Sequence, residues 1–157
     1  MNTRKTEQII VTAYSAYTLA LSVVATILHW PAWITPTIIA TMLLAWMAFI
    51  KGWKEYRARA FLYAGVTLIT FSLYAIMSSS FPSIMITFTT VVILLGLLGI
   101  PRLVFLEVCF SLLIFLYHFF VKQTIPTETG MDKSRLFVQI ASVVVSEIGA
   151  HYLVKRN

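Results

Sequence analysis

Apolar residues fill the chain in six long runs that are separated by short polar connections. The runs are rich in Leu, Ile, Val, Met, Phe and Ala, and none alternates strictly between apolar and polar positions. A helix needs about 20 residues to cross about 30 Å of hydrocarbon, and fewer suffice where the bilayer is thin. Runs that are apolar on all sides predict helices rather than barrel strands. We expect membrane spans at residues 9–28, 33–50, 60–77, 84–100, 103–121 and 136–154.

The prolines agree with these limits, because each lies in a connection or in the first turn of a span, where a missing N–H costs little. They are Pro31, Pro36, Pro82, Pro101 and Pro126. The connections are short, and among them the stretch 122–135 has room for a small loop. The pattern therefore predicts an all-α fold, a single polytopic membrane domain of six helices.

The basic residues predict the orientation, because Lys and Arg near span ends are retained on the cytoplasmic side. With the N-terminus inside, nine of the twelve basic residues are cytoplasmic: Arg4, Lys5, Lys51, Lys54, Arg57, Arg59, Arg102, Lys155 and Arg156. Lys122, Lys133 and Arg135 are then outside. Six spans return the C-terminus to the cytoplasm, so we expect an N-in, C-in, multi-pass protein of the cell membrane, a bacterial inner membrane.

The composition of the chain excludes several other classes of protein. The chain has 157 residues, 59% of them apolar and 11% charged, and its mean hydropathy is +0.86. The apolar content excludes a disordered chain, and the single Cys109 excludes a disulfide scaffold. The net charge of +6 comes from basic residues that lie mostly on the expected cytoplasmic side. We therefore expect a lipid bilayer as the partner and no nucleic acid. The first run lacks a small-x-small cleavage site and is interpreted as a retained signal-anchor helix.

Two of the six acidic residues fall inside expected spans. Glu107 and Glu147 both lie on the inner-leaflet side, in spans that run in opposite directions. An intramembrane carboxylate is expensive and suggests a functional site, here a cation or proton site or a polar switch between the last two helices. The alternative is a carboxylate that fixes packing or reaches the headgroups. The other four acids are expected in or near water: Glu7, Glu55, Glu128 and Asp132.

The last expected span carries two further patterns. His151 follows Glu147 by four residues on one helix face, so the pair can titrate together or simply face the headgroups. Ser142, Ser146 and Ala150 recur every four residues, and such small residues allow close helix approach. This stripe predicts either a homodimer seam through the sixth helix or packing within one subunit.

On the outer side, His29, Trp30, Trp33 and His118 are candidates for binding a ligand. Two histidines without a cysteine or carboxylate at ligand spacing do not predict a metal site. The span aromatics Tyr14, Tyr17, Phe61 and Tyr63 are expected to serve packing. The chain has no glycine-rich phosphate loop, no H-E-x-x-H and no G-x-S-x-G. We therefore expect no catalytic residue and no cofactor.

Two segments carry a family resemblance. The run from His29 to Pro36, which leads into the span with Trp46, and the run from Phe71 to Ser80 are similar to N-terminal multi-helix membrane regions of bacterial sensor histidine kinases. The resemblance implies an input module whose last helix continues into a cytoplasmic dimerising helix with a phosphoacceptor histidine and an ATP-binding domain. Neither is present in the 157 residues, so no catalytic residue carries over. A diguanylate cyclase is the alternative parent.

The expected function is a sensory input domain of a two-component system, which shifts its sixth helix and so regulates a cytoplasmic kinase module. If residue 157 ends the gene product, the kinase implication falls. A small-solute transporter or substrate-binding subunit is the alternative, with its site on the outer side. A third class is a membrane anchor or assembly subunit, in which changing Glu107 and Glu147 to Gln has no effect on any activity.

Overall fold

The computed structural model describes residues 3–52, 55–78 and 81–122, and all of its regular structure in these ranges is helical. The elements are α1 (Thr3–Ile27), α2 (Ile34–Lys51), α3 (Tyr56–Met77), α4 (Phe81–Leu97), α5 (Pro101–Tyr117) and the short π-helix η1 (His118–Lys122). The helices occupy the first five expected spans, and the sixth lies outside the described residues. The all-helical prediction is confirmed for the described part of the chain.

Three helices, α1, α2 and α3, are long and apolar enough to cross a membrane. Helices α4 and α5 have 17 residues each, or about 25 Å at 1.5 Å per residue. Large apolar side chains are more than half exposed on several helices, among them Ile27, Ile50, Ile93 and Leu113. Such broad apolar exposure suits a lipid environment rather than water, so the helices are those of a membrane protein.

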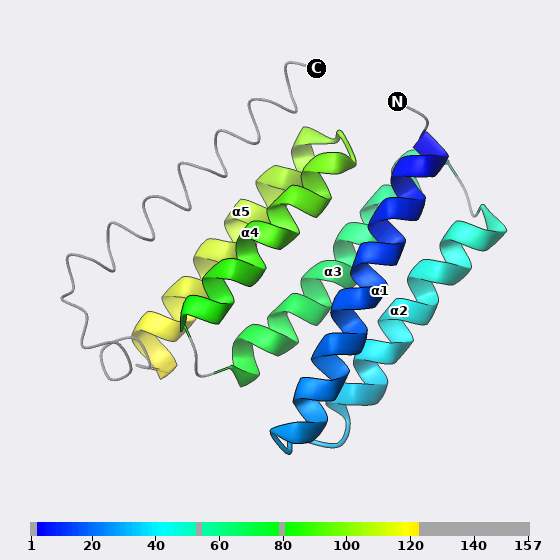
Figure 1. Cartoon of the computed structure of the whole chain (residues 1–157). Coiled ribbons are helices and arrows are strands. Elements are labelled where there is room, and N and C mark those ends of the chain that lie inside the picture. Colours follow the sequence, from blue (N-terminus) through cyan, green and yellow to red (C-terminus); the bar gives the residue numbers. More distant parts are fainter. Residues whose placement is uncertain (1–2, 53–54, 79–80, 123–157) are drawn as a thin grey trace. The chain divides into compact units, whose positions relative to one another are not determined.

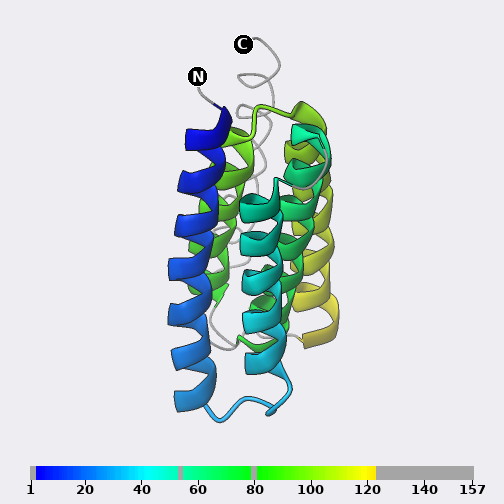
Figure 2. The same ribbon diagram turned by 90° about the vertical axis from the view of Figure 1, so that its right-hand side faces the viewer.

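The chain divides after Met77 into two compact units. The N-terminal unit (Met1–Met77) holds α1, α2 and α3, which alternate in direction, so that α1 and α3 run parallel (Figure 1). The loop between α1 and α2 lies at the end opposite the N-terminus (Figure 2). The described part of the C-terminal unit (Ser78–Asn157) is the antiparallel pair α4 and α5, whose Phe88 and Phe115 rings stack at 4.8 Å.

Buried positions in the N-terminal unit follow a heptad spacing of alternating fours and threes. On α1 they include Glu7, Val11, Tyr14, Thr18, Leu21 and Ala25, and on α2 they are Ile34, Ile38, Thr41, Ala45 and Ala48. This is the repeat that keeps one seam of a helix against its neighbours in coiled-coil-like bundles. The seam fixes which side chains meet between the helices.

The chain turns sharply after α1 and after α2, and each turn contains a residue in the left-handed conformation. Gly52 follows α2 with φ of 58° and donates its N–H to the carbonyl of Ala48, as a left-handed helix cap. After α1, the Trp30 N–H bonds the Ala25 carbonyl at 2.9 Å and the His29 N–H bonds the Thr26 carbonyl at 3.3 Å. This is a Schellman motif, and His29 occupies its left-handed position with φ of 52°.

Candidate functional site

A buried ion pair joins the starts of α1 and α3. The Arg59 Nε donates to Glu7 Oε2 at 2.9 Å and a terminal guanidinium nitrogen donates to Oε1 at 2.8 Å. The Tyr63 hydroxyl donates to Oε2 at 3.1 Å. The Glu7 side chain is 3% exposed and that of Arg59 is 17% exposed. The two-pronged geometry is the strong form of a charge-assisted hydrogen bond.

The expectation that Glu7 lies in or near water was wrong. Helix α1 begins at Thr3, six residues before the expected span, so Glu7 falls inside the helix at a heptad position. Because α1 and α3 run parallel, the start of α3 lies level with it, and Arg59 and Tyr63 are one turn apart on one face. Hydropathy marks Glu7 as polar, but it does not reveal a partner 52 residues away.

A hydroxyl cluster lies one heptad further along, with one residue from each helix. The Tyr14 hydroxyl is 2.8 Å from Thr41 Oγ1 on α2 and 2.6 Å from Thr70 Oγ1 on α3. It is also 3.1 Å from the Val66 carbonyl oxygen, and the two threonine hydroxyls are 3.1 Å apart. All three side chains are buried. The expectation that Tyr14 serves packing therefore omits its polar role, since its hydroxyl links three helices.

Two more contacts join α1 to α2. The Trp46 indole N–H donates to the Ser15 hydroxyl at 2.7 Å. The Arg4 guanidinium lies 5.2 Å from the centre of the Phe49 ring, a cation–π distance. Together with the ion pair and the hydroxyl cluster, these contacts give the N-terminal unit polar links between α1 and both other helices.

The far end of the N-terminal unit is apolar. Leu21, Ile34 and Ile38 form a buried cluster, against which five partly buried side chains pack: Tyr17, Trp30, Leu73, Tyr74 and Met77. The Trp30 and Tyr74 rings are 6.2 Å apart. Glu7 and Tyr14 of α1 thus meet Tyr63 and Thr70 of α3, and Met77, seven residues further on, packs against the cluster that holds Leu21.

Three of the four outer-side candidates lie in the N-terminal unit, where each has different surroundings. His29 is exposed and holds the left-handed position of the turn after α1, and Trp33 is exposed. Trp30 packs on the apolar cluster. His118 is wholly buried and belongs to the C-terminal unit. Among the described residues no cluster of His, Cys, Asp or Glu could hold a metal ion.

A polar stripe follows the buried face of α5 into η1. Glu107 and His118 are wholly buried and Ser111 nearly so, and the spacing places all three on one face. The Ser111 hydroxyl donates to Glu107 Oε1 at 3.1 Å, four residues back along the same helix. The Tyr117 ring meets the His118 ring edge-on at 5.6 Å. Glu107 is thus buried in the folded chain, as the sequence suggested.

The remaining candidates fall beyond the described residues. These are Glu147 and His151 together with the stripe Ser142, Ser146 and Ala150. Contact between Glu107 and Glu147, the polar switch and the dimer seam therefore stay predictions.

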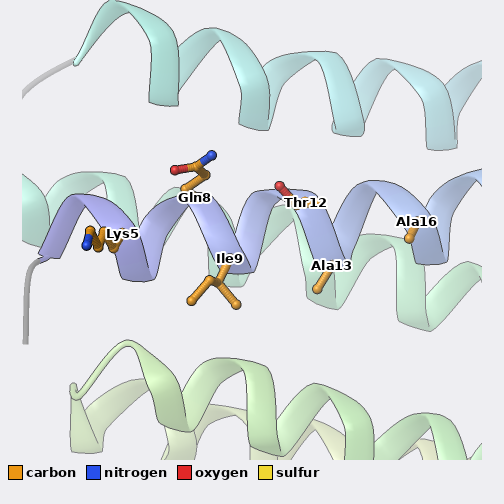
Figure 3. Close-up of a pocket in the computed structure, with 6 residues that line it drawn as sticks. All are labelled: Lys5, Gln8, Ile9, Thr12, Ala13 and Ala16. Carbon is orange, nitrogen blue, oxygen red and sulfur yellow. The ribbon is translucent and has the colours of Figure 1, made fainter.

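A groove of about 600 Å³ follows one side of α1 (Figure 3). Among the described residues it is lined by Lys5, Gln8, Ile9, Thr12, Ala13 and Ala16 of α1. Polar side chains lie toward its N-terminal end and two alanines toward the other. This face is separate from the heptad seam, because Glu7, Val11 and Tyr14 point into the unit.

Comparison with known proteins finds no matching family model, and neither a curated protein nor a solved structure matches the chain. The resemblance to sensor histidine kinase membrane regions therefore stays a prediction.

The polar interior that sequence reasoning missed does leave a signal in the sequence. Glu7 and Tyr14 are seven residues apart, and so are Tyr63 and Thr70. Polar residues at the same heptad phase in two apolar segments favour a shared seam when the segments run parallel. The first and third spans of an N-in protein do run parallel, so the repeat could have identified the pair.

Proposed function

We propose that the chain is the membrane-embedded input domain of a bacterial signalling protein, which passes a signal through its last helix to a cytoplasmic output module, a histidine kinase. The proposal is supported by three helices of membrane-spanning length. It is further supported by the expected cytoplasmic side of the C-terminus. The observation that carries it is the division after Met77 into two units, of which the second leads on to the expected sixth span.

A sensor needs an element with two arrangements, and a stimulus shifts their populations by binding one of them better. The N-terminal unit suits the role of a fixed frame. Its buried charge and hydroxyl groups are bonded across helices, and separating one partner from a buried pair is costly. A stimulus of ordinary binding strength leaves such a unit unchanged.

The C-terminal unit suits the role of the moving element. Its polar stripe of Glu107, Ser111 and His118 lies on one face of α5 and η1. A stripe on one helical face changes its surroundings when that helix rotates or slides. The chain then leads on to the expected sixth span, which would carry the signal inward.

A fusion of the full chain, after Asn157, to a kinase module of known output tests the proposal in membranes. We expect Glu107→Gln and Glu147→Gln each to change basal autophosphorylation at least threefold. Glu55→Gln, an exposed acid outside the helices, is the matched control and is expected to have no effect. Equal output from all variants, with all folded and inserted, would contradict the proposal.

Two further readouts distinguish the other classes. Saturable uptake or binding of a small solute, with no change in kinase output, favours a transporter or substrate-binding subunit. The second readout is the coding sequence beyond codon 157, which is independent of the uptake and kinase measurements. An in-frame kinase module there supports the input domain, whereas a stop codon with no co-expressed output partner contradicts it.

A further inference from the structure

One face of α1 carries polar side chains that the bundle does not use. Lys5, Gln8 and Thr12 follow one another at three and four residues, so they lie along one side of the helix. Within the described part of the chain Lys5 forms no ion pair, and the Gln8 amide and the Thr12 hydroxyl have no hydrogen-bond partner. All three are exposed.

Four serine and threonine side chains further along α1 behave differently. Each donates to a carbonyl of its own helix at 2.7 to 2.9 Å: Ser15, Thr18, Ser22 and Thr26. In lipid a polar group without a partner is costly, and bonding to the own backbone is the usual solution. Thr12 lies inside the expected span without this bond, so its hydroxyl is available to a molecule outside the bundle.

The groove beside these groups is polar at one end and apolar at the other, as a lipid is. From Lys5 to Ala16 it extends eleven residues, about 16 Å along the helix. Beyond the polar end, Ala13 and Ala16 leave room on the helix surface, and the exposed Ile9 provides an apolar wall (Figure 3).

We propose that this groove binds one anionic phospholipid. The Lys5 ammonium pairs with the phosphate, the Gln8 amide and the Thr12 hydroxyl donate to phosphate or ester oxygens, and an acyl chain lies over Ala13 and Ala16. The inference rests on the membrane location of α1 and not on the sensory role, so it stands if the kinase proposal fails. Charge complementarity selects the occupant, because a Lys attracts the anionic headgroups of the cytoplasmic surface.

An apolar helix is a poorer occupant of the groove. Covering it with apolar side chains buries Lys5, Gln8 and Thr12 without partners, and burying polar groups in this way is unfavourable. A zwitterionic phospholipid fits the shape but adds no net charge opposite Lys5. The proposal therefore predicts selectivity for headgroup charge in addition to a fit to the acyl chain.

Native mass spectrometry of the full chain in detergent, with phosphatidylglycerol or phosphatidylcholine added, tests the charge selectivity. We expect phosphatidylglycerol to bind at least fivefold more tightly, and Lys5→Gln to lower its affinity about fivefold, the effect of one basic residue at an anionic surface. Lys51→Gln removes the same charge from the end of α2, outside the groove, and is expected to leave the affinity unchanged. Equal losses in both variants would show a nonspecific charge effect and overturn the proposal.

A second pair of variants tests the shape of the groove. Ala16→Leu fills the floor and is expected to lower the affinity for both lipids at least threefold. Ala40→Leu, at an exposed position of α2, is its control and is expected to have no effect. If Ala16→Leu instead lowers the melting temperature and leaves lipid binding unchanged, a helix fills the groove and the lipid proposal is wrong.

Discussion

The two units each bury a carboxylate, and the hydrogen bonds described for the two carboxylates differ in which helix carries the partner. In the N-terminal unit Glu7 on α1 is bonded to Arg59 and Tyr63 on α3. In the C-terminal unit Glu107 accepts a hydrogen bond from Ser111 on its own helix. A bond between helices fixes their relative register, whereas a bond within one helix does not. A buried carboxylate therefore restrains the packing of two helices only when its hydrogen-bond partner lies on the other helix.

The largest expected effect comes from separating the charges of the N-terminal unit. Arg59→Met leaves Glu7 buried without its cation, and removing one partner of a buried pair costs about 3–5 kcal/mol. We expect this loss in the free energy of unfolding, measured by denaturant titration in micelles. The double variant Glu7→Leu with Arg59→Met is expected to regain most of it. A loss of less than about 1 kcal/mol in Arg59→Met would show that the pair does not restrain α1 against α3.

Removing the tyrosine hydroxyl at the centre of the three-helix cluster has a smaller effect. Tyr14→Phe keeps the ring but deletes the group that meets Thr41, Thr70 and the Val66 carbonyl. Interhelical hydrogen bonds in membranes contribute about 0.6 kcal/mol on average and up to about 1.7. We expect a loss of about 1–1.5 kcal/mol by thermal unfolding. Tyr117→Phe, on an exposed face of α5, is the control, and an equal loss there would contradict the prediction.

Tyr63 and Ser111 each place a hydroxyl 3.1 Å from a buried carboxylate, so removing each hydroxyl compares the two units directly. Tyr63→Phe removes a bond between helices and is expected to cost about 1 kcal/mol. Ser111→Ala removes a bond between residues four apart on one helix, and such pairs contribute about 0.2–0.5 kcal/mol. Calorimetry of the two variants under one set of conditions measures the difference. An equal or larger cost for Ser111→Ala would contradict the prediction.

A last, small effect is a gain in stability. His29 adopts a left-handed conformation that costs a non-glycine residue about 1–2 kcal/mol, and glycine avoids most of this cost while adding freedom to the unfolded chain. We expect His29→Gly to raise the stability of the N-terminal unit by about 0.5 kcal/mol, seen as a higher melting temperature. His29→Ala, which keeps the strain, is the control. Destabilisation by glycine would indicate that the imidazole itself makes a stabilising contact.

Much of the fold could be predicted from the sequence, because hydropathy reports which segments leave water. The second span was expected at 33–50 and α2 is Ile34–Lys51, and Pro101, expected in a connection or in the first turn of a span, is the first residue of α5. The start of α1 was missed by six residues. Thr3 to Gln8 are polar but helical, and hydropathy measures apolar character rather than backbone conformation.

The candidate site was harder to predict from the sequence than the fold. Glu107 was singled out because it lies within an apolar run, and it is indeed buried. Glu7 was expected in or near water, although its side chain is buried and bonded to Arg59 and Tyr63. Whether a polar residue near a span end faces water or a partner depends on which distant segment lies beside it. That contact is a property of the packed helices and not of the local sequence.

The pairing of Glu7 with Arg59 also constrains how the protein is made. At a synthesis rate of about 5–20 residues per second, the 52 residues that separate the two take roughly 3–10 s to follow. During that interval Glu7 exists without its cation, and the polar start of α1 is best accommodated among the lipid headgroups. Biogenesis therefore has two steps, insertion of α1 with Glu7 at the surface and burial of Glu7 when α3 arrives.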